Sequence, residues 1–183
     1  MRPNRHIAVR HRGFTLLELI TTMAVGIVLV GFAVPSMTTF MRNHRVLTAA
    51  DSLNIAVTKA RSIAASTTSY VTVAPIEDGS WNSGWRVFSE HGTPNGEFDG
   101  ADTLIAQYDR LPADVTITAT TSPGNLGYIA FSPVGYSQTA SKQQMSMSVG
   151  FQIGVAKRVV EVSLLGRSRV CDPTRDATTC VMP

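Results

Sequence analysis

The pattern of hydrophobic and polar positions divides the chain into two parts. Residues 14–35 form an almost uninterrupted apolar run, whereas the rest of the 183 residues mixes apolar and polar positions. A helix of 22 residues is about 33 Å long, which is enough to cross the hydrocarbon core of a bilayer. The pattern therefore predicts a transmembrane helix over residues 14–35.

Helical periodicity continues beyond this run, and Pro35 is expected to kink the helix rather than end it. Apolar residues recur at spacings of three and four: Leu47, Ala50, Leu53, Val57, Ala60 and Ala64. We expect residues 36–66 to form an amphipathic helix whose apolar stripe packs against a globular core.

From residue 67 the period changes to that of β-strands. Candidate strands cover residues 70–74, 85–89, 103–108, 115–118, 128–131, 145–153 and 158–165. Glycine, proline, asparagine and aspartate mark the turns between them, and the last two strands form a hairpin. One amphipathic helix followed by short strands predicts an α+β fold with the helix packed on antiparallel sheet. Residues 67–165 would form this β-rich domain, with Trp81 and Trp85 as core or edge residues of the sheet.

The positive charge is concentrated near the N-terminus. Four of the 16 lysines and arginines lie within residues 1–13. The rest of the chain has 12 basic and 13 acidic residues, which gives it a net charge of −1. Whole-chain basicity is therefore no argument for nucleic-acid binding. The four arginines predict that residues 1–13 stay in the cytoplasm and that the rest of the chain lies outside.

Three kinds of N-terminal segment begin with basic and then apolar residues. A cleaved secretory signal has a shorter apolar core of about 7–15 residues. A plain signal anchor fits the length but leaves Glu18 unexplained, since a carboxylate costs about 3 kcal/mol at the membrane centre. The third kind, a prepilin leader, accounts for Glu18.

The junction Gly-Phe-Thr-Leu-Leu-Glu, from Gly13 to Glu18, resembles the prepilin peptidase site of type IV pilins and type II secretion pseudopilins. The resemblance implies that a prepilin peptidase removes the leader, residues 1–13, by cutting between Gly13 and Phe14. It also implies that the new amine of Phe14 is methylated. Glu18 would then offer a counter-charge to the amine of a neighbouring subunit during filament assembly.

The rest of the chain is similar to the GspH/FimT branch of pseudopilins. The residues that carry the similarity are Ala60-Arg61-Ser62-x-Ala64, Tyr70 to Pro75, Gly79-x-Trp81-x-x-Gly84-Trp85-x-Val87-Phe88, Phe131-x-Pro133-x-Gly135 and Gly166-Arg167. The similarity is strongest at the N-terminus and sparse after Phe88. It implies the pilin-like fold, with other pilin subunits as partners.

The two cysteines, Cys171 and Cys180, lie within the segment 166–183, which we expect to form a basic tail. Two cysteines this close in an exported domain suggest a disulfide that closes a terminal loop, with free thiols as the alternative. A metal site is disfavoured because no histidine is near. Relatives often carry a cysteine at the position of Ala74, and its loss here favours the C-terminal pair.

The sequence contains no recognisable catalytic or cofactor-binding motif. We therefore expect neither an enzyme nor a cofactor. The acidic stretch 97–102 resembles a calcium loop only loosely, because no bidentate carboxylate follows at loop spacing, and it is interpreted as a solvated turn.

One cluster of basic residues is a candidate binding site: Lys157, Arg158, Arg167, Arg169 and Arg175. In an extended segment Arg167 and Arg169 project to the same side, and two guanidinium groups suit phosphate oxygens. The Gly-Arg-x-Arg arrangement also resembles DNA-binding minor pilins of natural transformation. A solvated tail or a salt bridge between subunits is the alternative.

Two functions follow from the resemblance. The first is a minor type IV pilin in the bacterial inner membrane, with a periplasmic C-terminal domain, that is assembled into an extracellular pilus and binds DNA without sequence preference. The second is a minor pseudopilin of a type II secretion system, with a structural role in protein export. A pilin needed only for priming or adhesion is a more distant third.

Overall fold

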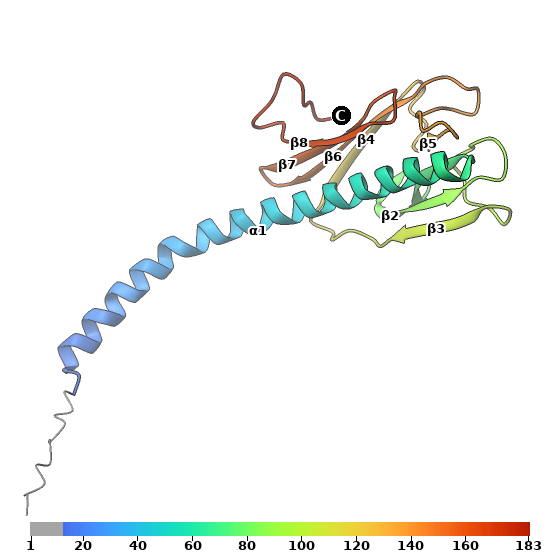
Figure 1. Cartoon of the computed structure of the whole chain (residues 1–183). Coiled ribbons are helices and arrows are strands. Elements are labelled where there is room, and N and C mark those ends of the chain that lie inside the picture. The colour runs from blue at the N-terminus through green and yellow to red at the C-terminus, as the bar shows by residue number, and fades with distance from the viewer. Residues whose placement is uncertain (1–12) are drawn as a thin grey trace, which may run out of the picture. The chain divides into compact units, whose positions relative to one another are not determined.

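The computed structural model describes residues 13–183, apart from the side chains of residues 32–36 (Figure 1). The chain divides into two units, Met1–Thr39 and Phe40–Pro183, and α1 (Leu16–Thr67) runs through both. The helix passes position 35 without interruption. Residues 1–12 of the predicted leader lie outside the described residues.

The first turns of α1 carry apolar side chains that are exposed in the isolated chain, among them Leu16 and Ile27. Among the residues described, no helix combines the length and the apolarity needed to cross a membrane. The membrane span over residues 14–35 stays a prediction.

The part of α1 within the second unit packs on the strands with nearly the face that the sequence predicts. The buried residues of this face are Val46, Ala50, Leu53, Val57, Ala60 and Ala64. Leu47, which we expected in the stripe, is 38% exposed, whereas its neighbour Val46 is fully buried. Counted from position 46, the buried residues follow one another in steps of four and three, which keeps their side chains on one helix face. Position 47 lies outside this series.

The first of two four-stranded sheets has the order β3-β2-β1-β5. Its strands are β1 (Val71–Glu77), β2 (Ser80–Ser89), β3 (Thr103–Tyr108) and β5 (Ile129–Phe131), all antiparallel to their neighbours. Strand β2 begins five residues before the predicted strand 85–89, because Ser80 already pairs with Glu77 across a turn at Gly79, whose φ is 69°.

The second sheet has the order β4-β6-β7-β8. Its strands are β4 (Thr116–Ser122), β6 (Ser146–Ile153), β7 (Ala156–Val162) and β8 (Ser168–Cys171). The predicted hairpin is present as β6 and β7. Strand β8 was not predicted: it lies in the segment 166–183 that we expected to be a tail, and it pairs antiparallel with the end of β7.

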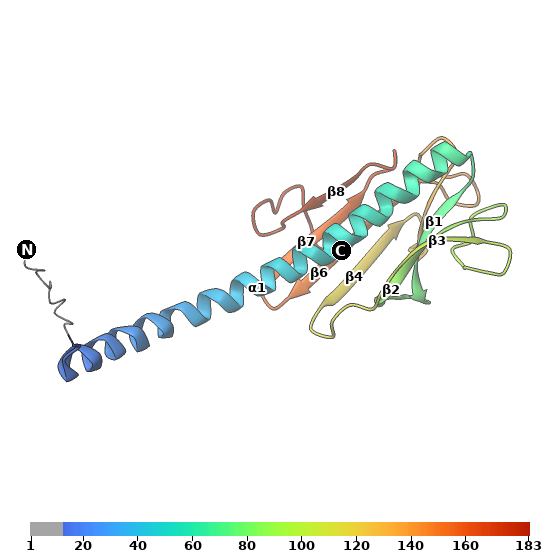
Figure 2. The same ribbon diagram turned by 60° about the horizontal axis from the view of Figure 1, so that its bottom comes forward.

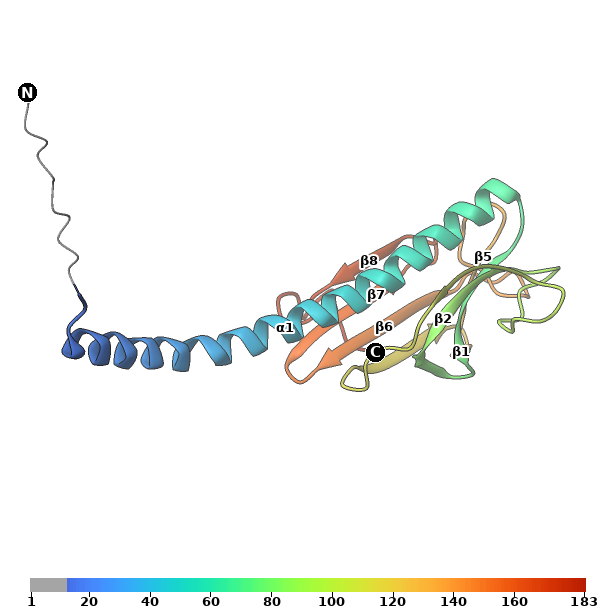
Figure 3. The same ribbon diagram turned by 90° about the horizontal axis from the view of Figure 1, so that it is seen from below.

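Both sheets turn one face, the inner face, toward α1, which lies along them (Figures 2 and 3). The shared core contains Leu53 of the helix, Trp85 and Phe131 of the first sheet and Phe151 of the second, all essentially inaccessible to solvent. Trp81 is also buried, at 5% exposed. The predicted α+β fold, a long helix packed on antiparallel sheet, is confirmed. Both tryptophans, which we expected in the core or at an edge of the sheet, lie in the core.

The opposite, outer face of the first sheet is covered by the loop between β2 and β3. Phe98 of this loop meets Phe88 edge to face at 5.4 Å between ring centroids. Under the loop, the Glu90 carboxylate accepts hydrogen bonds from the Thr72 hydroxyl at 2.7 Å and from the Gly96 amide at 3.3 Å. Burial raises the pKa of Glu90, against the lowering effect of these hydrogen bonds. This loop includes the acidic stretch 97–102, which therefore helps to cover the sheet.

Candidate functional site

The β7–β8 hairpin positions the basic residues that the sequence singles out. Alternation along β8 places Arg169 on the outer face of the second sheet, directly opposite Glu161 of β7. Arg167, two residues earlier, lines the same outer face. The two arginines therefore line one face of the sheet, and the sequence predicts this for an extended segment.

Gly166 fixes the turn that leads to Arg167. Its φ is 75°, a conformation that favours glycine, and a Cβ atom there would lie 2.5 Å from the carbonyl oxygen of Gly135. The turn therefore packs tightly against the loop at Gly135. The Ser163 hydroxyl accepts a hydrogen bond from the Arg167 amide at 3.1 Å, which closes the turn.

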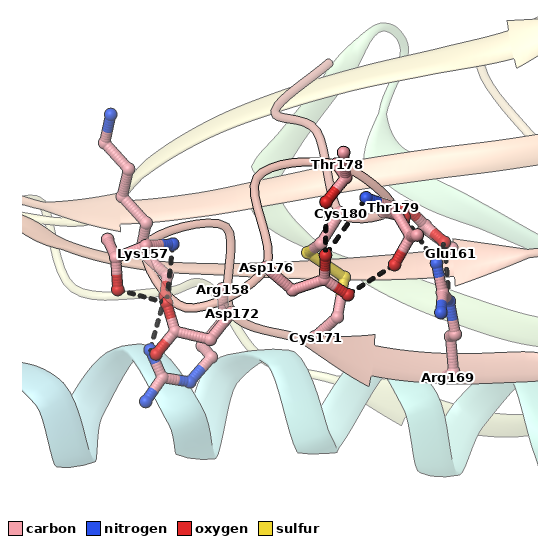
Figure 4. The surroundings of a disulfide bond; sticks show 11 residues. Lys157, Arg158, Glu161, Arg169, Cys171, Asp172, Asp176, Thr178, Thr179 and Cys180 are labelled. Atoms are coloured by element: carbon pink, nitrogen blue, oxygen red, sulfur yellow. Dashed lines mark hydrogen bonds and ion pairs between the residues drawn. A yellow bond between two sulfur atoms is a disulfide. The ribbon is translucent and has the colours of Figure 1, made fainter.

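Arg169 is tied into the structure on two sides (Figure 4). Its Nε donates to the Glu161 carboxylate at 2.7 Å, and its Nη2 donates to the carbonyl oxygen of Thr179 in the C-terminal loop. The Arg169 side chain is still 52% exposed. Arg169 thus links β7 to the loop while leaving part of its guanidinium accessible.

Arg158 points to the other side of β7, toward α1, and pairs with Asp172 at 2.9 Å. The side chains of this pair are only 16% and 15% exposed. Burial alone would raise the pKa of Asp172, but hydrogen bonds from Thr174 and the charges of Arg158 and Arg175 lower it below its usual range. Arg158 therefore holds the start of the C-terminal loop instead of facing solvent.

The remaining two basic residues, Lys157 and Arg175, do not line the surface that holds Arg167 and Arg169. Arg175 approaches Asp172 at 3.7 Å, and its side chain is 85% exposed on the loop. Lys157 points away from Arg158 in Figure 4. Among the described residues, neither Lys157 nor Arg167 has a carboxylate within ion-pair distance. Of the five predicted cations, Arg167 and Arg169 therefore share one surface, Arg158 and Arg175 flank Asp172, and Lys157 belongs to neither group.

The disulfide between Cys171 and Cys180 is present, with 6.0 Å between the Cα atoms. Asp176 organises the loop, because its carboxylate accepts a hydrogen bond from the Thr179 amide at 3.1 Å. Hydrogen bonds from Thr179 lower the pKa of Asp176. Glu161 lies close to both sulfur atoms, but they are bonded to each other and offer no thiolate to a metal. The predicted disulfide is confirmed.

A groove of about 680 Å³ runs over the outer face of the second sheet beside Arg167 and Arg169. Hydroxyl groups form much of its lining: Thr120, Ser122, Ser146, Ser148 and Ser163. Our sequence interpretation missed this surface. Its signal was the alternation of threonine and serine with apolar residues, from Thr116 to Ser122 and again from Ser146 to Ser148.

At the N-terminus, Gly13 and Phe14 precede the helix, and Phe14 is 81% exposed. The Thr15 hydroxyl accepts a hydrogen bond from the Glu18 amide at 3.2 Å, which makes Thr15 the N-cap of α1. A carboxylate in the first turn also suits the helix dipole. The sequence Thr-x-x-Glu thus has a local role in starting the helix, which our sequence interpretation did not consider.

A long N-terminal helix packed on two antiparallel sheets defines a pilin-like protein. The prokaryotic N-terminal methylation motif matches residues 9–34, and this motif is that of membrane-anchored pilus or pseudopilus components. The family model of the type II transport protein GspH matches residues 49–166. The chain belongs to the GspH family of minor pilins and pseudopilins, as the sequence resemblance predicts. Proteins of this family assemble with other pilins in filaments.

Solved structures agree with this fold. A crystal structure of the type IV minor pilin FimU from Pseudomonas aeruginosa PAO1 superposes with a TM-score of 0.54 at 18% identity, covering 74% of this chain and 94% of FimU. A second crystal form gives a TM-score of 0.50 at the same identity, with 70% and 94% covered. Comparison with curated protein sequences gives no match.

Proposed function

We propose that this chain is a minor type IV pilin that binds extracellular DNA, without sequence preference, for uptake in natural transformation. The observation that carries the proposal is the pair of arginines, Arg167 and Arg169, on the open face of the second sheet. Arginine contacts phosphate oxygens through a planar fork of donors, and such contacts do not depend on base sequence. Lys157 and Arg175 would add charge nearby, whereas Arg158 is better assigned to holding the loop.

The affinity of one subunit should be low. Non-specific DNA binding typically has a Kd of ~10⁻⁴–10⁻⁶ M at physiological salt. If two or three basic residues reach phosphates, log K should fall with log salt at a slope of about −2 to −3. Several subunits along a filament, or several contacts along one DNA molecule, would raise the overall affinity by avidity.

The test combines binding with transformation. The double variant Arg167→Gln/Arg169→Gln removes two positive charges and keeps long polar side chains. We expect it to lose most of its affinity for any DNA sequence and to be transformation-defective, while circular dichroism and pilus assembly stay normal. Lys59→Gln/Lys142→Gln, which removes two exposed charges elsewhere on the chain, is the matched control. Wild-type protein that fails to bind DNA at low salt would contradict the proposal.

A second candidate function is a minor pseudopilin of a type II secretion system. The family model that matches residues 49–166 carries the description of a type II transport protein, and this favours the alternative. A pseudopilin has no need of an arginine pair for DNA. Loss of protein secretion with unchanged transformation in a deletion strain would support the pseudopilin and contradict the DNA-binding pilin.

For either function we propose the same maturation. A prepilin peptidase in the inner membrane would cut between Gly13 and Phe14, and the helix would stay in the membrane until the subunit enters the filament. Gly13→Ala should leave a precursor that is 13 residues longer on a gel. Glu18→Ala should be processed normally but fail to enter filaments, because its carboxylate would no longer meet the amine of a neighbour. The melting temperature of the globular unit should not change.

The helix offers a surface for that assembly. Leu47 and Ile55 of α1 are 38% and 59% exposed and do not belong to its buried face. Apolar residues exposed on one helix face suit contact with another subunit. This supports the proposed place of the chain among other pilin subunits.

A further inference from the structure

We propose that the groove on the outer face of the second sheet holds the sugar–phosphate backbone of duplex DNA, with Arg167 at its edge and serine and threonine hydroxyls along its floor. This inference rests on the proposed DNA-binding function and adds residues of β4 and β6 to the site. It also assigns Glu161 a role in limiting the affinity.

The groove supplies hydrogen-bond donors. Four hydroxyls line the groove without a hydrogen-bond partner among the residues that the structure describes: Thr120, Ser122, Ser146 and Ser148. They come from two adjacent strands, and Thr120 lies directly opposite Ser148 in the register. Serine and threonine hydroxyls are common donors to phosphate oxygens. A row of them can follow a phosphate backbone without reading its sequence.

The residues around the groove also carry a net positive charge. Arg167 and Arg169 stand at one side of the groove, and Glu161 is the carboxylate among its lining residues. The site therefore has a net charge of +1, which favours an anion. The Glu161 carboxylate, 27% exposed, occupies part of the Arg169 fork and would repel a nearby phosphate. Glu161 thus keeps the affinity low enough for DNA to dissociate from the subunit.

The lining of the groove favours duplex DNA over a single strand. Proteins that bind single strands typically stack the bases on aromatic side chains. None of the residues lining this groove is aromatic, within the part of the chain that the structure describes. Duplex DNA keeps its bases stacked inside and presents phosphates outward, so it needs no such platform.

One pair of variants separates the groove from the rest of the face. Thr116 and Thr120 lie on the same strand, both exposed on the outer face, but only Thr120 lines the groove. Thr120→Asp and Thr116→Asp change the net charge equally. Thr120→Asp should weaken binding by about tenfold or more, because it sets a carboxylate against phosphate, and Thr116→Asp should stay close to wild type.

A third variant should bind more tightly. Glu161→Gln keeps an oxygen that can accept from Arg169 but removes the negative charge. We expect its affinity for DNA to rise about threefold at low salt. A gain of affinity cannot come from misfolding, so this variant keeps the proposal testable if the others lose stability.

Fluorescence anisotropy of the mature chain, residues 14–183, in detergent measures these effects, with labelled DNA of about 30 base pairs or the same length of single strand. We expect the duplex to bind at least as tightly as the single strand. If Arg167→Gln weakens binding but Thr120→Asp and Thr116→Asp behave alike, DNA does not bind in the groove. The proposed DNA-binding function would still be supported. If the wild type binds neither probe at low salt, both fail. A clear preference for the single strand would overturn the choice of duplex.

Discussion

The outer faces of the two sheets differ in what covers them. On the first sheet, the β2–β3 loop lies over the strands and builds a small second core around Phe88, Phe98 and Tyr128. On the second sheet, a disulfide-closed loop covers one end, and hydroxyls and charges occupy the open remainder. The same β architecture therefore buries one outer face for stability and leaves the other accessible to a ligand.

The largest expected effect lies on the covered face. Phe88 is fully buried, and Phe88→Ala should lower the free energy of unfolding by about 3–5 kcal/mol. Urea denaturation measures the loss. Phe98→Ala, at a residue 38% exposed on the loop, should cost less. DNA affinity of folded Phe88→Ala should match the wild type; a large loss of affinity would mean that the two faces are not independent.

The disulfide gives the next largest effect, on the open face. Cys171 and Cys180 are nine positions apart, and in the chain-entropy model a loop of this length contributes about 2–3 kcal/mol. Cys171→Ser/Cys180→Ser should lose this amount and loosen the loop that Arg169 contacts. Mass spectrometry of non-reduced peptides checks the bond in the wild type. Free thiols after periplasmic expression would contradict the pairing.

A smaller, pH-dependent effect distinguishes the covered face. The folded chain raises the pKa of Glu90 above its ordinary value of 4.5, so the folded state binds this proton more tightly than the unfolded chain. The resulting stability is present below pH 4.5 and is lost as pH rises through the raised pKa. From about pH 4 to about pH 7, Glu90→Gln should therefore gain stability relative to the wild type. Glu77→Gln, on an exposed side chain, is the control, and an equal trend in both would refute the role of Glu90.

The sequence predicts the fold well where local patterns decide it. The 103–108 strand was predicted with the bounds of β3, and the 145–153 strand differs from β6 by one residue, because turn residues and alternation mark both. Strand β8 was missed because its four residues, Ser168 to Cys171, carry a weak strand pattern and are held by pairing with β7. Strand pairing of this kind cannot be read from local periodicity.

The sequence predicted the arginines of the candidate site, but not their ion pairs or the groove beside them. The pair Arg167 and Arg169 could be found because two arginines at a spacing of two share a face in any extended segment. The ion pair of Arg169 with Glu161 and the burial of Arg158 against Asp172 depend on strand register, which the sequence did not reveal. The hydroxyl groove needs β4 and β6 side by side, and these strands are separated by β5 in the chain.

One measurement tests the division between the two faces most directly. Arg86 lies on the covered face, with its guanidinium 5.4 Å from the Phe98 ring centroid, and Arg167 lies on the open face. Arg86→Gln and Arg167→Gln remove the same charge, so a general electrostatic effect would be equal in both. In DNA-binding titrations over a range of salt, Arg167→Gln should lose about tenfold in affinity and about one unit of salt slope, while Arg86→Gln should stay within about twofold of the wild type. Equal losses in the two variants would contradict the account.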